Sequence, residues 1–235
     1  MARARLSVLE PLKERDQLAQ RTYEAIRAAI LANAIPPGTP LSVPELARRL
    51  EVSRSPVREA VQRLIYDGLA SHVPNRGAVV DQVEVDEITE LYAVREVLEG
   101  LAARLATQNA SRDGVDSLRE ITAQHEELVR DGGDVDAHLQ LDMAFHRTIR
   151  TLAGNHYLSE ILESIVNRSH SVMHSLWPIS EAAHAALCEH QTILDAMAAG
   201  APEVAEEAAR EHISRLRVRL LQTLRAAPSP VAAAT

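Results

Sequence analysis

The chain of 235 residues has one cysteine, little aromatic character and no long apolar run. The single thiol, Cys188, excludes an internal disulfide and suits a reducing compartment, so we expect a cytoplasmic protein with this side chain buried. No apolar run approaches the roughly 20 residues of a membrane span, and the arginine-rich N-terminus lacks the apolar core of a signal peptide, so we expect no membrane association. Aromatic residues are 3% of a chain that is 46% hydrophobic, which is typical of an Ala-, Leu- and Val-rich helical protein.

Basic residues are in the minority overall, but not in the first third of the chain. The formal net charge is −8. Residues 1–80 nevertheless contain 12 Lys and Arg against 8 Asp and Glu, whereas residues 81–235 contain 13 against 25. This asymmetry indicates a polyanion-binding module joined to a body that does not bind polyanions. Nine of the ten histidines lie beyond residue 120, in the acidic part.

Residues 16–81 predict a winged helix-turn-helix of the α+β class. Helices are indicated at 16–33, at 43–50 and from about Pro56, with Ser55 or Ser53 as the cap of the third helix. The third helix has apolar residues at helical spacing: Val57, Ala60, Val61, Leu64 and Ile65. A tight turn precedes this helix, and residues 69–80 have the pattern of a short hairpin around a Pro-Asn-Arg-Gly turn. Three helices followed by a hairpin define the fold. Residues 1–15 are expected to be a flexible arm.

The rest of the chain predicts an all-α antiparallel helical bundle over residues 86–225. Breaks at glycine and proline positions divide it into six expected helices: 86–109, 115–130, 134–152, 156–177, 180–199 and 202–225. The links between them are short, which favours antiparallel neighbours. Residues 226–235 form a low-complexity tail that is expected to be disordered.

Two series of motifs resemble the GntR superfamily of bacterial transcriptional regulators. The first runs from Pro37-Gly38 to Val80 and includes Ser-Arg-Ser-Pro-Val-Arg-Glu-Ala at 53–60 and Arg-Gly-Ala at 76–78. The second resembles the helical FCD ligand-binding domain of the FadR-type branch, and its motifs are at 91–99, 142–146, 153–155, 189–194 and His212. The resemblance covers about residues 17–222 and implies a dimeric regulator that responds to a small-molecule effector.

The helix after residue 53 presents arginines and hydroxyl groups at its N-terminus, which suits phosphates and guanine edges. An ordinary solvated helix face is the alternative. The resemblance implies DNA contacts for six residues: Ser53, Arg54, Ser55, Arg58, Arg76 and Gly77. The arginines of the helix would reach the major groove and its serines the phosphates, whereas the pair at the hairpin tip would approach the minor groove.

A second candidate site combines a carboxylate with three imidazoles. Asp142 and His146 lie one helical turn apart on one face, and His190 and His212 lie on later helices between apolar positions. Such a set suits zinc, and also nickel, cobalt, manganese or iron. Surface pairs or hydrogen-bonded core histidines are the alternatives. One branch of the family binds a divalent metal at these motif positions, so the resemblance implies a metal ion, with zinc as the first expectation.

Arg95 is the candidate effector-binding residue. The resemblance implies that it lines the ligand cavity, where a guanidinium would bind the carboxylate of a small organic acid. A surface pair with Glu99 is the alternative. Glu189, beside His190, is expected to point elsewhere. The remaining histidines of the acidic part are expected to be mostly solvated: His125, His138, His156, His170, His174 and His184, of which His170 and His174 are also candidates for the cavity.

We therefore expect a ligand-responsive transcriptional regulator, a repressor that binds a pseudo-palindromic operator in double-stranded DNA as a homodimer. Two half-sites need two recognition helices roughly 34–36 Å apart. A metal-dependent hydrolase with an accessory DNA-binding module is one alternative, since such a metal site can leave positions open. We expect no enzyme, because no HExxH arrangement or nucleophile elbow is present. A regulator with a purely structural metal is the other alternative.

Overall fold

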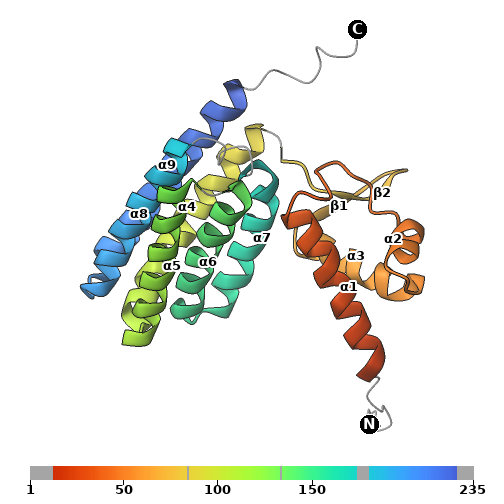
Figure 1. Ribbon diagram of the computed structural model, residues 1–235, viewed down its shortest axis with the longest axis horizontal. Coiled ribbons are helices and arrows are strands. Elements are labelled where there is room, and N and C mark those ends of the chain that lie inside the picture. Colours follow the sequence, from red (N-terminus) through yellow and green to blue (C-terminus); the bar gives the residue numbers. More distant parts are fainter. Residues whose placement is uncertain (1–12, 84, 133, 174–179, 227–235) are drawn as a thin grey trace, which may run out of the picture. The chain divides into compact units, whose positions relative to one another are not determined.

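A computed structural model describes residues 13–83, 85–132, 134–173 and 180–226 (Figure 1). It divides after Asp81 into two compact units. The expected flexible arm and the expected disordered tail lie outside the described residues, except where helix α1 begins at Lys13 and helix α9 ends at Ala226. None of the described helices is long and apolar enough to cross a membrane.

The N-terminal unit has three helices and a two-stranded sheet, which confirms the predicted winged helix-turn-helix. Its elements are α1 (Lys13–Leu31), α2 (Val43–Arg49), α3 (Arg54–Tyr66), β1 (Ala70–Val73) and β2 (Gly77–Val80). The strands pair antiparallel, with Ala70 opposite Val80. The preceding loop is fixed to this hairpin, because the Leu41 N–H donates to the Ala78 carbonyl at 2.8 Å.

Helix α3 begins at Arg54, and its N-cap residue is Ser53, one of the two caps that the sequence left open. Ser53 has extended backbone angles (φ −69°, ψ 164°); Arg54 is exposed and Ser55 is partly buried, whereas Pro56 and Val57 are buried. Apolar periodicity marks only the buried positions, so it does not decide between the two caps. The buried side of α3 contains Val57 and Leu64, which are fully buried between this helix and its neighbours.

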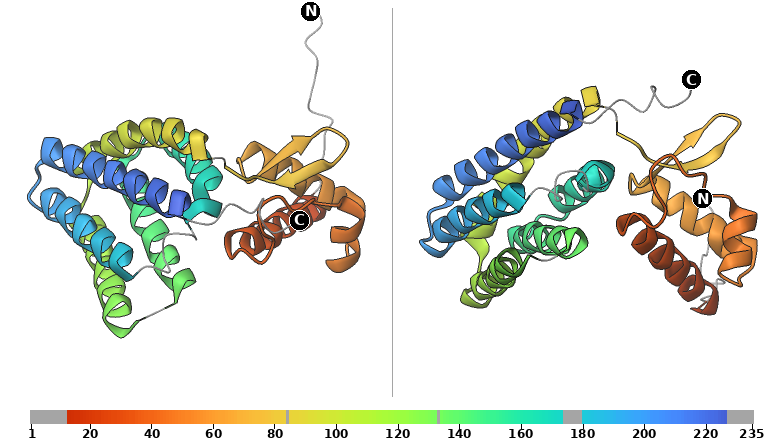
Figure 2. Two further views of the ribbon diagram at one scale, coloured as in Figure 1. Left: turned by 90° about the horizontal axis from the view of Figure 1, so that it is seen from above. Right: turned by 45° about the horizontal axis from the view of Figure 1, so that its top comes forward.

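The C-terminal unit is helical, which confirms the second predicted fold class. Its helices are α4 (Val85–Asn109), α5 (Arg112–Asp131), α6 (Val135–Ala153), α7 (His156–Met173), α8 (Ser180–Ala198) and α9 (Pro202–Ala226). Five of them form a ring in the order α4, α9, α8, α5 and α6, which returns to α4, and α7 packs against α4 and α6. Figure 2 shows the long helices α4 and α9 side by side from two further directions.

Local signals explain where several of these helices begin and end. The Asp134 carboxylate accepts a hydrogen bond from the Ala137 N–H at 2.8 Å and caps α6. Gly154 ends the same helix in the left-handed conformation (φ 64°), which glycine adopts without strain. Gly100 has another role: a Cβ atom here would lie 2.6 Å from Cγ of Arg210. The missing side chain therefore lets α9 approach α4 closely.

Candidate functional site

The predicted DNA-contacting residues lie at the start of α3 and at the tip of the hairpin. The side chains of Ser53, Arg54 and Arg58 are exposed. Ser55 is partly buried, and its hydroxyl donates to Glu59 at 3.1 Å. A free helix N-terminus with two guanidinium groups is suited to phosphates and to the acceptor edge of guanine.

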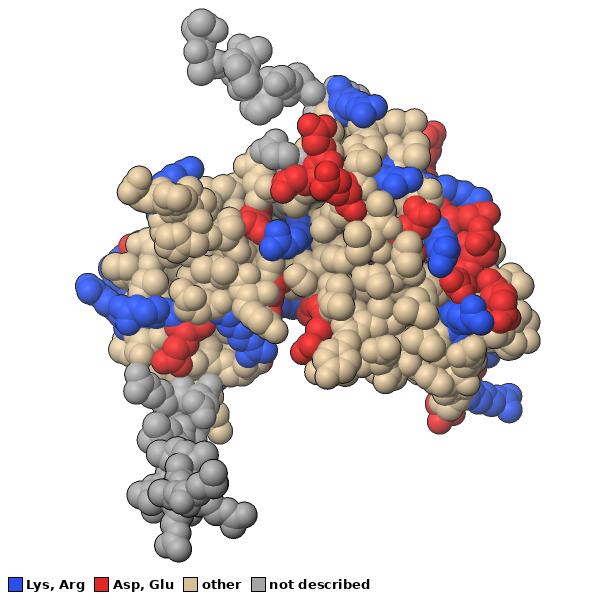
Figure 3. Space-filling view, turned by 180° about the vertical axis from the view of Figure 1, so that it is seen from behind, with Lys and Arg blue, Asp and Glu red and all other residues tan. Residues whose placement is uncertain are grey.

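The hairpin tip presents the other two predicted residues. Arg76 and Gly77 are both exposed, and Gly77 has a positive φ of 77° with no atom within 4 Å of the place where a Cβ would be. Such a position allows close approach of another backbone. Figure 3 shows basic patches with some acidic side chains on the visible face of the N-terminal unit. On the visible face of the C-terminal unit it shows broad acidic patches interrupted by basic side chains.

Contacts with α1 hold α3 in place. The Tyr23 hydroxyl donates to the Asp67 carboxylate at 2.5 Å, and the guanidinium of Arg63 lies 4.1 Å from the centre of the Tyr23 ring. Burial and this hydrogen bond raise the pKa of Tyr23 to about 12, and the phenol is therefore neutral at physiological pH. The end of α3 is thus fixed to α1, which orients the exposed arginines at its start.

The second predicted site is brought together inside the helical ring. Asp142 and His146 come from α6, His190 from α8 and His212 from α9, and each is at most 3% exposed. One ligand atom from each residue can be chosen so that all four lie within 4.8 Å of one another. Among the described residues this is the one cluster of three or more His, Cys, Asp or Glu side chains that could hold a metal ion.

Two carboxylates outside the cluster orient its imidazoles. Glu189 accepts from Nδ1–H of His212 at 2.8 Å, and Glu99 lies 3.5 Å from Nδ1 of His146. A carboxylate can only accept a hydrogen bond here, so each contact favours the tautomer whose Nε2 carries a lone pair. The two Nε2 atoms lie 3.2 Å apart. Two lone pairs at this distance repel each other unless a cation or a proton lies between them.

The donor set fits a divalent metal ion. Asp142 Oδ1 and His190 Nε2 are buried, lie 3.5 Å apart and have no hydrogen-bond partner in the described part of the chain. Buried polar atoms without partners are costly. Tetrahedral bonds of about 2.0–2.2 Å place ligand atoms roughly 3.3–3.6 Å apart. Two pairs here, at 3.2 and 3.5 Å, are close to this range, and all four atoms lie within 4.8 Å of one another. Burial also lowers the pKa values of His190 and His212, which favours the neutral imidazole that a metal requires.

Glu189 points toward the site, contrary to the expectation that its side chain points elsewhere. It accepts hydrogen bonds from Arg219 at 2.8 and 2.9 Å as well as from His212. Burial opposes its ionisation, but these three hydrogen bonds lower the pKa of Glu189 to about 2, so it is an anion at neutral pH. The sequence indicated this role of Glu189 only through its position directly before His190, a proposed metal ligand.

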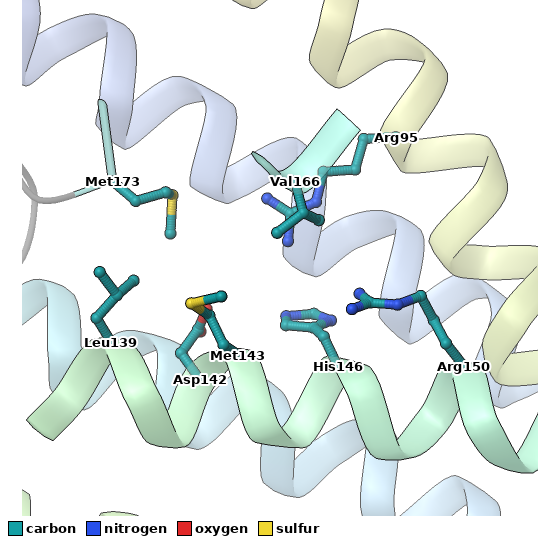
Figure 4. Close-up of a pocket in the computed structure, with 8 residues that line it drawn as sticks. All are labelled: Arg95, Leu139, Asp142, Met143, His146, Arg150, Val166 and Met173. Carbon is teal, nitrogen blue, oxygen red and sulfur yellow. The ribbon is translucent and has the colours of Figure 1, made fainter. Parts of the chain in front are cut away.

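A narrow cavity adjoins the candidate metal ligands (Figure 4). Its lining residues come from α4, α6 and α7: Arg95, Leu139, Asp142, Met143, His146, Arg150, Val166 and Met173. Arg95 is buried, and its Nε donates to Glu99 at 3.4 Å. The two residues are therefore paired inside the bundle and not at its surface. Arg150 also lines the cavity, and sequence reasoning did not find it.

Two of the histidines that were expected to be solvated are buried. His125 on α5 and His138 on α6 face the interior of the ring, with ring centroids 5.4 Å apart, and His125 lies 6.2 Å from the His190 ring. Histidine is found on either face of a helix, so its identity does not predict burial. The candidate side chains of His170 and His174 lie outside the described residues.

Cys188 is exposed, contrary to the expectation that it is buried. Its Sγ lies 3.8 Å from Nε2 of His184, one turn earlier on the outer side of α8. The inner side of this helix is occupied by Glu189, His190 and Ile193, which are buried. The thiol is therefore not part of the core.

A winged helix-turn-helix unit joined to a helical unit with a buried cluster of one aspartate and three histidines is typical of the class of DNA-binding transcriptional regulators. Residues 18–80 match the gntR family of bacterial regulatory proteins, and residues 90–215 match the FCD domain. The chain therefore belongs to the GntR family and carries an FCD domain.

Several relatives agree with this assignment. The chain is 30% identical to a "Probable D-xylose utilization operon transcriptional repressor" from Paenarthrobacter nicotinovorans, over 85% of this chain and 87% of the relative. It is 25% identical to the HTH-type transcriptional repressor RspR of Escherichia coli, over 84% of this chain and 86% of that relative. The fold also matches a crystal structure of a GntR transcriptional regulator from Rhodococcus sp. RHA1, with a TM-score of 0.74 and 28% sequence identity. The match covers 90% of this chain and 100% of that chain. The matched families and relatives are transcriptional regulators, so the chain is a regulator and not a hydrolase.

Proposed function

We propose that this regulator is a repressor that binds a pseudo-palindromic operator as a homodimer and responds to a small organic acid. The repressor assignment is supported by the names of two relatives, the D-xylose operon repressor and RspR. In this proposal residues 16–81 bind DNA, and residues 86–225 bind a metal ion and the effector and form the dimer. Such a protein acts in the cytoplasm, where bacterial DNA lies.

The proposed DNA contacts are those of α3 and the hairpin tip. Arg54 and Arg58 would read bases and backbone in the major groove, where a bidentate guanidinium–guanine pair contributes about 1–3 kcal/mol of discrimination. Ser53 and Ser55 would bind phosphates, although Ser55 would first have to release Glu59. The support is the exposure of both arginines at a helix N-terminus.

The proposed metal ligands are Asp142, His146, His190 and His212. The observation that carries this proposal is the pair of facing Nε2 atoms at 3.2 Å, next to two buried ligand atoms without partners. Zinc suits the donor set, and nickel, cobalt, manganese and iron are alternatives. When bound, the ion would supply positive charge next to the cavity. Together with Arg95 it would attract a carboxylate.

An apolar stripe on α4 supports the homodimer. Val94, Val97 and Leu101 follow one another at helical spacing and are 51%, 49% and 37% exposed. Exposed apolar stripes of this kind are common where a partner packs. A second copy would place two recognition helices for the two half-sites of an operator.

Metal analysis and DNA binding test the proposal together. We expect about one equivalent of divalent metal per purified wild-type chain, a strong reduction in His212→Ala, and specific operator binding that is lost in Arg54→Ala. Arg119→Ala, at an exposed position of α5, is the matched control for DNA binding. Metal below stoichiometry that His212→Ala leaves unchanged would reject the metal site, and retained operator binding by Arg54→Ala would reject the recognition helix.

Effector binding separates this proposal from the alternative of a purely structural metal. If the metal is only structural, its removal unfolds the helical unit and no carboxylate raises the melting temperature of the loaded protein. If the effector binds as proposed, a carboxylate raises that temperature in the presence of the metal.

A further inference from the structure

Arg150 is a buried cation on the same stripe of α6 as two of the proposed metal ligands. Asp142, His146 and Arg150 follow one another at four-residue intervals, so their side chains leave one face of the helix. Arg150 is 6% exposed, and its Nη1 has no hydrogen-bond partner within the described ranges. Figure 4 shows its guanidinium, and that of Arg95 from α4, directed toward the space around His146.

The carboxylate nearest to these two cations is shared between them. Glu99 lies 3.4 Å from Nε of Arg95 and 3.7 Å from Nη1 of Arg150. Charge-assisted hydrogen bonds between such groups are normally about 2.7–2.9 Å long. Arg95 also donates from Nη1 to the Tyr92 hydroxyl at 3.3 Å. One carboxylate and one hydroxyl at these longer distances do not satisfy two forked guanidinium groups. The cavity can therefore accept further anionic oxygens.

The charges inside the site lead to the same expectation. Among the buried groups, Arg95 and Arg150 are balanced by Glu99 and Asp142, and the charge of Glu189 is offset by Arg219. The three histidines of the metal cluster are neutral when they bind a metal. A divalent ion would then leave an excess of two positive charges in a buried region. Buried charge is costly unless it is paired. A ligand with two negative charges would neutralise the site, whereas one with a single charge would not.

We propose that Arg150 is a specificity-determining residue that binds a second acidic group of the effector, so that the effector is a small dicarboxylic acid. This inference rests on the proposed function, because it assigns the first carboxylate to the region of Arg95. Arg150 would bind the other carboxylate through Nη1, which lies 3.7 Å from Glu99 and has no hydrogen-bond partner among the described residues.

The cavity limits the effector to a short molecule. Its volume is about 10 Å³, which is room for about one water molecule. Met143 and Met173 are among its lining residues, and methionine side chains are flexible enough to rearrange around a ligand. A dicarboxylic acid of a few carbon atoms would enter as these side chains move, with its carbon chain against Leu139 and Val166.

Titration calorimetry with succinate and butyrate tests this inference. Both acids have four carbon atoms, and they differ by one carboxylate. For the zinc-loaded wild type we expect succinate to bind about 10–100 times more tightly than butyrate, as for a charge-assisted hydrogen-bonded pair. In Arg150→Gln this ratio should fall toward one. Arg147→Gln, at an exposed position on the same helix, should keep the wild-type ratio.

Two measurements keep the outcome clear. Zinc content and circular dichroism of each variant show whether the fold and the metal site are intact, and Arg150→Lys, which keeps the charge without the fork, should retain part of the preference. A preference for butyrate, no binding of either acid, or an unchanged ratio in Arg150→Gln would overturn the inference. If the wild type binds no zinc, the proposed metal site fails, and the excess charge fails with it. A preference of the metal-free protein for succinate that Arg150→Gln removes would then still support the role of Arg150, and no such preference would overturn it.

Discussion

Replacing Glu189 with glutamine removes one negative charge beside the proposed metal centre and keeps the size of the side chain. In the wild type, Glu189 accepts a hydrogen bond from Nδ1–H of His212 at 2.8 Å. It also accepts from two nitrogens of Arg219, at 2.9 and 2.8 Å. The carboxylate thus fixes the imidazole tautomer and makes the opposite Nε2 more basic. Glutamine can keep the geometry through its one carbonyl oxygen, but it cannot supply the charge.

The expected loss follows from this geometry. Removal of the carboxylate partner of a metal-binding histidine typically lowers metal affinity about 10–100-fold. That range corresponds to about 1.4–2.7 kcal/mol of binding free energy. His212→Ala removes the ligand itself and should lower the affinity further. Arg219 also loses its charged partner in Glu189→Gln, so we expect the metal-free variant to unfold at a lower temperature than the metal-free wild type.

Competition with a chromogenic zinc chelator measures the affinity directly and separates it from the change in folding stability. Glu203→Gln is the matched control, because Glu203 lies on the same helix α9, is 69% exposed and pairs with Arg104, which is not a proposed metal ligand. An affinity in Glu189→Gln equal to that of the wild type would refute the role assigned to this carboxylate. An equal loss in Glu203→Gln would show a general effect of net charge instead.

Three further predictions concern other parts of the chain. Val97→Glu places a charge on the exposed apolar stripe of α4 and should convert the proposed dimer to a monomer in analytical ultracentrifugation. The pKa of Tyr23 is raised to about 12 by burial and the hydrogen bond to Asp67. The neutral phenol therefore stabilises the fold fully below pH 10, and this contribution is lost as the pH rises toward 12. The difference in phenolate absorbance between wild type and Tyr23→Phe should show this titration. Gly100→Ala places a Cβ 2.6 Å from Arg210 and should destabilise the packing of α4 on α9 by about 1–3 kcal/mol in chemical denaturation.

Each of these predictions has an outcome that contradicts it. A Val97→Glu protein that sediments as a dimer would place the interface elsewhere. A Tyr23 phenol that titrates near pH 10 would mean that the hydrogen bond to Asp67 is not formed in solution. A stability gain in Gly100→Ala would mean that Arg210 moves aside easily and that the helix propensity of alanine dominates.

The sequence predicted those features of the DNA-binding unit that depend on neighbouring residues. Apolar spacing in α3 predicted which side is buried, and therefore that Arg54 and Arg58 are exposed. The hairpin followed from its turn residues around Gly77. The start of α3 was left open between caps at Ser53 and Ser55, because apolar periodicity marks only buried positions; the structure has Ser53 as the cap.

The four proposed metal ligands were identified from one local pair and from resemblance. Asp142 and His146 lie on the same face of their helix however the helices pack, since they are four residues apart. The approach of His190 and His212 to this pair was an expectation from the family. Nothing in their own spacing requires it, because they lie on other helices.

The sequence by itself determined the two fold classes, the exposed arginines and the pairing of Asp142 with His146, because helical periodicity, turns and caps act over a few residues. Only the tertiary structure decided which helices meet. It brought Glu189 to His212 and made Arg150 a buried cation that shares Glu99 with Arg95. These contacts depend on the packing of whole helix faces and on the close approach of α4 and α9, and no local pattern encodes them.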